Sequence, residues 1–84
     1  MESQMIDDAL EHGIEFGKGL KKKNINITST GQRLNHFQQN ENHEKFVEMY
    51  FKLAMEIGVP VNKKIVTGDK KMIQSFLIGL SQEF

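Results

Sequence analysis

The sequence has no cysteine, and this absence excludes three kinds of chemistry. Without thiols the chain can form no disulfide framework, no thiolate metal site and no cysteine nucleophile. Its first residues, MESQMIDDALEHG, carry acids where a secretory signal would carry bases, and no apolar run approaches the length of a membrane span. We therefore expect a soluble protein of the reducing cytoplasm that makes no contact with a membrane.

The chain also lacks net charge, because eleven basic residues offset eleven acidic ones. Attraction of the whole protein to nucleic acid is therefore not expected, and any such binding must come from an uneven distribution of charge. At 84 residues the chain is one domain at most, and a chain of this size buries only about 60% of its unfolded surface. Such a small domain often depends on a partner.

Apolar residues recur at helical spacing along the chain, and no strand-like alternation of useful length appears. We predict four helices, over residues 3–22, 30–39, 43–57 and 69–81, within one domain that covers residues 1–84. The expected fold class is all-α, a four-helix bundle. In the first helix, Gly13 and Gly17 lie within the apolar stripe, where each costs about 1 kcal/mol of helix propensity. Either another helix packs closely against them, or the helix frays or bends there.

Local capping signals give the expected ends of the later helices. Ser29 with Gln32 three residues later matches a capping box, which starts the second helix near Thr30. The segment from Val59 to Val66 is expected to be extended. The remaining predicted caps and breaks are Asn40 or Asn42 before the third helix, Gly58 and Pro60 after it, and Thr67 or Asp69 before the fourth.

The third predicted helix is apolar on two sides, with a narrow polar stripe between them. One predicted face comprises Phe46, Met49, Tyr50, Leu53 and Ile57, and the other comprises Val47, Phe51, Ala54 and Met55. The first face suits the core of the domain. Val47, Phe51 and Met55 either complete that core or meet another subunit, because apolar surface left over on a small monomer often marks an interface.

Catalysis finds little support in the sequence. The three histidines, His12, His36 and His43, lack the spacing of a helical zinc pair, and we expect them at the surface or at helix caps. Glu11 and Glu15 lie one turn apart on a helix face that we expect to be solvated, where nothing would separate their pKa values. We expect no enzyme activity, no cofactor and no metal.

The basic residues cluster near predicted helix ends. They are Lys18, Lys21, Lys22, Lys23, Arg33, Lys63, Lys64, Lys70 and Lys71. If the four helices alternate up and down, these residues share one pole of the bundle. Such a pole could bind a nucleic-acid backbone without reading its sequence. The alternative is that they are ordinary solvated lysines.

The last fifty residues resemble a known family. The runs GQRLNHF, HEKFVEMYFKLAMEIGVPVNKKI and MIQSFLIGL are similar to the C-terminal helical region of the large subunit of type I-B CRISPR Cascade complexes. The matching positions are Arg33, Leu34, Lys45, Phe46, Leu53, Gly58, Pro60, Phe76, Gly79 and Leu80. A short chain of this kind resembles the small subunit that such systems produce from an internal start in the large-subunit reading frame, which here would be Met1.

This resemblance implies a non-catalytic role. A Cascade small subunit would contact the large and backbone subunits while supporting the guide RNA and the target or displaced DNA strand. Whether further copies of itself are also partners is left open by the resemblance. Formation of an R-loop is nearly balanced in energy, so a few contacts from lysine and arginine can tip it. The alternative is a small helical protein-interaction module of the immunity-protein or antitoxin type, whose activity is to cover a protein partner.

Overall fold

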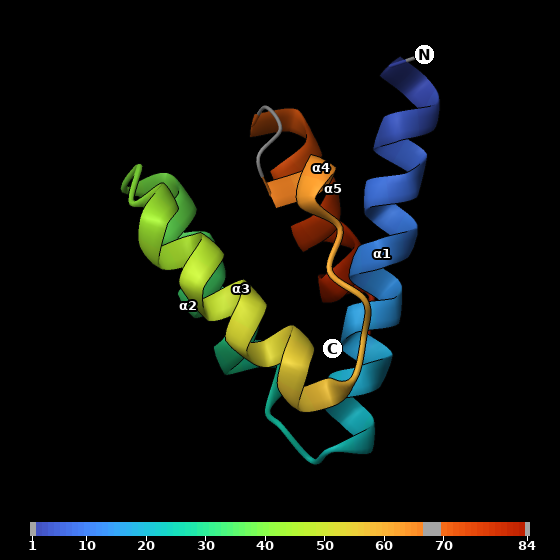
Figure 1. Cartoon of the computed structure of the whole chain (residues 1–84), viewed down its shortest axis with the longest axis vertical. Helices are drawn as coiled ribbons and strands as arrows, with labels where there is room; N and C mark the ends of the chain where they lie inside the picture. The colour runs from blue at the N-terminus through green and yellow to red at the C-terminus, as the bar shows by residue number, and fades with distance from the viewer. Residues whose placement is uncertain (1, 67–69, 84) are drawn as a thin grey trace.

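The part of the chain that the structure describes forms four helices of three turns or more and one additional short helical turn (Figure 1). The computed structural model describes residues 2–66 and 70–83, and the side chains of residues 2–6, 64 and 66 lie outside that description. The helices are α1 (Glu2–Lys22), α2 (Ile27–Gln39), α3 (His43–Ile57), the single turn α4 (Lys63–Val66) and α5 (Lys70–Ser81). The prediction of an all-α four-helix bundle is confirmed.

The ends of α3 follow the predicted local chemistry. The side chain of Asn42 caps its N-terminus by accepting a hydrogen bond from the Lys45 N–H at 3.4 Å. Gly58 ends the helix in the left-handed conformation, with φ of 74°, which glycine adopts without steric cost.

The start of α2 differs from the prediction. Asn26 is the N-cap, and its side chain accepts a hydrogen bond from the Ser29 N–H at 2.9 Å. Ser29 therefore lies inside the first turn, and the predicted capping box with Gln32 is wrong. The earlier start brings Ile27 into the helix and buries it against the core.

Close backbone packing joins α1 to α5. A Cβ atom added to Gly13 would collide with the carbonyl oxygen of Phe76, and one added to Gly79 would collide with the carbonyl oxygen of Leu10. The two glycines thus let the helices approach until their backbones touch, which is the first of the two alternatives open for Gly13. Gly17 also packs closely, since its added Cβ would lie 2.9 Å from the side chain of Glu83.

The chain crosses back along the bundle between α3 and α5, so α5 runs in the same direction as α1 (Figure 1). Accordingly, Gly13 of α1 lies against Phe76 and Leu80 of α5. Gly17, about one turn later in α1, lies against Leu80 and against Glu83 beyond the end of α5. The crossing segment is not extended throughout as predicted, because α4 interrupts it and buries Ile65. The predicted caps Thr67 and Asp69 lie outside the described residues.

The core is centred on a cluster of rings. His12 and Phe16 of α1, Tyr50 of α3 and Phe76 of α5 all pack within 6.2 Å of one another, measured between ring centroids. Ala54 is buried beside this cluster and so belongs to the core face of α3, not to the second apolar face. Within residues 2–66 and 70–83, no helix has the length and apolar character needed to cross a membrane.

Candidate functional site

The basic residues do not gather at one pole, contrary to the prediction. Lys21 Nζ lies 3.3 Å from Glu83 Oε2, just beyond the end of α5, whereas Lys70 Nζ at its start lies 3.6 Å from Glu41 Oε1. The 12 residues of α5 separate these two points by about 18 Å, at about 1.5 Å per residue. The prediction failed because it assumed that α5 runs antiparallel to α3, whereas the crossing segment makes it parallel to α1.

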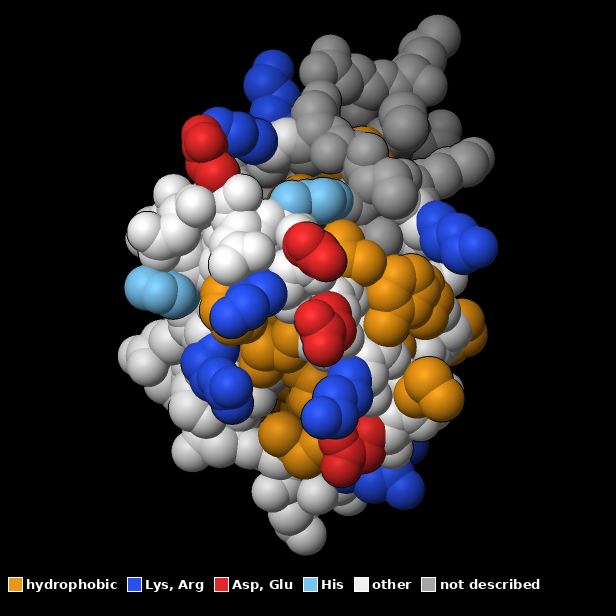
Figure 2. All heavy atoms as spheres, turned by 60° about the vertical axis from the view of Figure 1, so that its left-hand side comes forward, with side chains coloured by type: hydrophobic (Ala, Val, Ile, Leu, Met, Phe, Trp, Pro, Cys, Tyr) orange, Lys and Arg blue, Asp and Glu red, His pale blue; other side chains and the backbone are white. Residues whose placement is uncertain are grey.

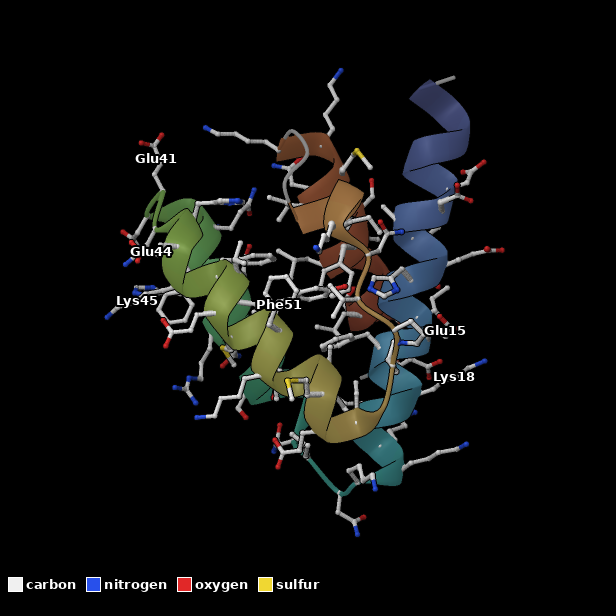
Figure 3. The ribbon with its side chains drawn as sticks, in the orientation of Figure 1. Glu15, Lys18, Glu41, Glu44, Lys45 and Phe51 are labelled. Carbon is white, nitrogen blue, oxygen red and sulfur yellow. The ribbon has the colours of Figure 1, made fainter. Side chains whose placement is uncertain are left out.

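The predicted lysines instead occupy separate regions of the surface. Lys22 and Lys23 are exposed at the end of α1, and Figure 3 shows Lys18 on the opposite side of the molecule from Lys45. Lys63 lines a shallow groove beside α1, and Lys71 is exposed next to Lys70. The side chain of Lys64 lies outside the described residues.

A cationic groove lies between α2 and α3, with a volume of about 240 Å³. We name it the α2–α3 groove, and it is lined by Arg33 and Phe37 of α2 and by Lys45, Glu48, Met49 and Lys52 of α3. Phe37 and Met49 are half-buried and form an apolar floor, while the charged side chains are exposed at the rim. Figure 2 brings this side of the molecule forward and shows blue side chains around orange ones.

The three cations of the α2–α3 groove are available to a ligand. No ion pair within the described part of the chain engages Arg33, Lys45 or Lys52, so one acid, Glu48, stands against three positive charges at the rim. Lysine and arginine can neutralise the phosphates of a nucleic-acid backbone, and an apolar floor between them can contact a base. The arrangement suits a flexible, negatively charged polymer.

Of the residues that line this groove, only Arg33 was predicted from the sequence to bind nucleic acid. Lys45 and Lys52 were missed, although their spacing of seven residues puts them on one face of α3, with Glu48 between them. Their partner Arg33 lies on another helix. Only the pairing of α2 with α3 shows that the three charges meet.

The candidate subunit interface forms an apolar strip on α3. Val47 and Phe51 are half-buried against the core, while Met55 is 82% exposed. The charged residues Glu44, Glu48, Lys52 and Glu56 recur every four positions and form a column on α3 that separates this α3 strip from the α2–α3 groove. Figure 2 shows orange side chains on both sides of a column of red and blue ones. One helix thus presents a cationic groove and an apolar strip to different directions.

His12 is buried, so the prediction that it lies at the surface is wrong. Its Nε2 lies 2.5 Å from the Tyr50 Oη, which also accepts a hydrogen bond from the Asn62 N–H at 2.9 Å. Burial lowers the pKa of His12, an effect that the charge of Glu15 partly opposes, and burial raises the pKa of Tyr50. We therefore assign neutral His12 as the acceptor of the Tyr50 proton, a bond that ties α1 to α3 and to the crossing segment.

The other histidines lie at the surface, as predicted. His36 is exposed and contacts Asn40 one turn later, and His43 is exposed at the first position of α3. Across residues 2–66 and 70–83, no cluster of three or more histidine and carboxylate side chains could hold a metal ion.

Comparison with protein-family models, with curated proteins and with solved structures found no match to this chain. The resemblance to the Cascade large subunit therefore rests on the sequence positions named for it and on no independent relative.

Proposed function

We propose that this chain is a non-catalytic binding subunit that holds a nucleic-acid backbone in the α2–α3 groove and docks on a neighbouring protein through the α3 strip. The observation that carries the proposal is the meeting of Arg33, Lys45 and Lys52 above Phe37 and Met49, with no ion pair to a carboxylate among residues 2–66 and 70–83. Binding of this kind needs no net charge on the whole protein, because the three cations act locally.

The resemblance gives this role a setting. In a type I-B Cascade complex, the α3 strip would face the large or backbone subunits, and the groove would follow the guide RNA or a strand of the target DNA. A groove that contacts phosphates and stacks on bases without hydrogen-bonding their edges is tolerant of sequence, as R-loop formation on many targets requires.

The binding test compares two triple variants that each remove three positive charges. R33Q/K45Q/K52Q neutralises the α2–α3 groove, and K21Q/K22Q/K23Q neutralises the end of α1. Affinity for a single-stranded oligonucleotide is measured between about 50 and 200 mM salt. We expect the groove variant to reduce the slope of log affinity against log salt by about 2, since each phosphate contact contributes about 0.7. The α1 variant should resemble the wild type.

Three results would count against parts of this proposal. If the groove variant binds as tightly as the wild type, the α2–α3 groove is not the site. If only the α1 variant loses affinity, the site lies at the end of α1. Co-expression with type I-B large and backbone subunits should yield a purified complex that holds this chain together with guide RNA, and its exclusion from that complex would remove the Cascade setting.

A protein-interaction module of the immunity-protein or antitoxin type is the second candidate, favoured by the exposure of Met55 at 82%. The triple variant V47S/F51S/M55S separates the two functions. It would disable a module that acts only by covering a protein, yet leave the binding of a free oligonucleotide at the groove intact. Loss of neither activity would count against the α3 strip as a docking surface.

A further inference from the structure

A second groove, between α2 and α5, carries no charged side chain. Its volume is about 340 Å³, and α5 contributes Gln74, Leu77, Ile78 and Ser81 to its lining. Ile78 is 55% exposed and adjoins half-buried Leu77 in this lining. Opposite it, α2 contributes Gly31 and Asn35 to the lining.

The lining of this groove on α5 has a self-complementary order. The four residues are spaced by three, one and three positions, so they form a seam along one face of the helix. Their order is polar, apolar, apolar, polar, which reads the same from either end. Two copies of α5 placed antiparallel about a two-fold axis would therefore set Leu77 against Ile78 of the other copy, and Gln74 against its Ser81.

We propose that the α5 seam is the contact surface of a symmetric homodimer, in which Ile78 of each copy enters the α2–α5 groove of the other. A symmetric contact brings a surface against itself, so a surface of one dominant charge would repel its own copy. The α2–α3 groove carries an excess of cations, and the charged column on α3 has Glu44, Glu48 and Glu56 with only Lys52. The uncharged seam has no such penalty.

The dimer would leave the proposed binding site open. Gly31 and Asn35 line the seam's groove, whereas Arg33 and Phe37 line the α2–α3 groove. These two pairs are offset by two residues, which is about 200° around α2 at about 100° per residue. The homodimer thus presents two cationic grooves facing away from its contact. The homodimer proposal does not depend on what the cationic grooves bind.

The test is the mass of the full chain by sedimentation equilibrium from micromolar to millimolar concentration. A seam of two helical turns is smaller than a standard interface, so we expect association only at the higher concentrations. There, the mass should rise from 9.7 kDa towards twice that value. I78E and I78K should each weaken association by about tenfold or more, because like charges then meet at the two-fold axis.

Mixing I78E with I78K provides the sharper result, since the opposite charges should restore a mixed dimer. K18E is the matched control, because it places the same charge on an exposed side chain of α1 outside the seam and should leave the mass unchanged. Circular dichroism checks that each variant is folded. A wild type that stays at 9.7 kDa throughout, or an I78E variant that associates like the wild type, would overturn the proposal.

Discussion

The α1–α5 pair and the α2–α3 pair are built for different purposes. Between α1 and α5 the backbones touch at Gly13 and Gly79, and the ion pair of Lys21 with Glu83 lies just beyond the end of α5. Between α2 and α3 the contact opens into a groove rimmed by Arg33, Lys45 and Lys52, and α3 leaves Met55 exposed beside it. The α1–α5 contact leaves no space for larger side chains at these glycines, and it stabilises the fold. The α2–α3 pair keeps charged and apolar surface that the fold does not use, which is where recognition is expected.

The largest predicted effect comes from placing a methyl group in the α1–α5 contact. Gly13→Ala and Gly79→Ala should each lower the free energy of unfolding by about 3 kcal/mol or more, because the new Cβ meets a backbone carbonyl that cannot move aside. That loss is most of the stability of a domain this small. Without the clash, replacing glycine by alanine would stabilise a helix by about 1 kcal/mol. The sign of the change in the free energy of unfolding therefore shows whether the clash occurs.

Gly19→Ala is the matched control for this series. Its added Cβ would lie 3.0 Å from Ile57 Cδ1 and 3.1 Å from Val59 Cγ2, which are ends of side chains that can shift. We expect a change within about 1 kcal/mol. Urea unfolding followed by circular dichroism measures all three variants, and equal stability of Gly13→Ala and wild type would show that the helices do not touch there.

The next effect is the loss of the buried phenol. Tyr50→Phe removes the hydrogen bonds of the phenol to His12 and to the Asn62 N–H, and should cost about 1–3 kcal/mol because one of them is buried and the other is part-buried. Hydrogen exchange at the Asn62 amide should accelerate more than exchange within α2. Ser81→Ala, which removes an exposed hydrogen bond to the Ile78 carbonyl, is the control and should be nearly neutral. Unchanged protection of Asn62 would disprove this link.

A pH dependence follows from the burial of His12, which lowers its pKa. The pKa of His12 is lower in the folded protein than its usual value of about 6.5, so below that value the unfolded chain binds more protons. The contribution of neutral His12 to the free energy of unfolding is therefore fully present above pH 6.5. It declines as the pH falls towards the folded-state pKa of His12. His12→Gln should flatten stability against pH between about 7 and 5.5, whereas the exposed control His36→Gln should not. A flat profile in the wild type would contradict the assignment.

The smallest predicted effect on stability lies in the α2–α3 pair. Met55→Lys should change the free energy of unfolding by no more than about 0.5 kcal/mol, because the side chain is 82% exposed. Thermal unfolding monitored by circular dichroism measures it. A loss as large as that of Gly13→Ala would erase the distinction between the two pairs of helices.

Local chemistry predicted much of this fold. The ends of α3 follow from Asn42 and Gly58, whose side-chain and backbone preferences act within a few residues. The start of α2 could not be chosen in this way, since Asn26 and Ser29 are both good caps and only the burial of Ile27 favours the earlier one. Four helices were predictable from apolar spacing, but the direction of α5 was not, because it depends on its contact with Gly13.

The candidate site was less predictable for the same reason. Lys45 and Lys52 are one stripe in the sequence, yet their meeting with Arg33 depends on how α2 packs on α3. His12 has polar neighbours in the sequence and is buried only because Tyr50, 38 residues away, provides its partner. The prediction that the basic residues share one pole was wrong because the four helices do not alternate in direction.

Chemical-shift mapping by NMR tests the central claim, that recognition lies in the α2–α3 pair, most directly. A single-stranded oligonucleotide is added at low salt to the isotopically labelled chain, and backbone amide shifts are followed. The account predicts that the largest shifts occur around Arg33, Lys45 and Lys52, that they diminish as salt is raised, and that α1 and α5 stay unaffected. Shifts concentrated at Lys21–Lys23 or at Lys70 and Lys71, or no shifts at all, would contradict it.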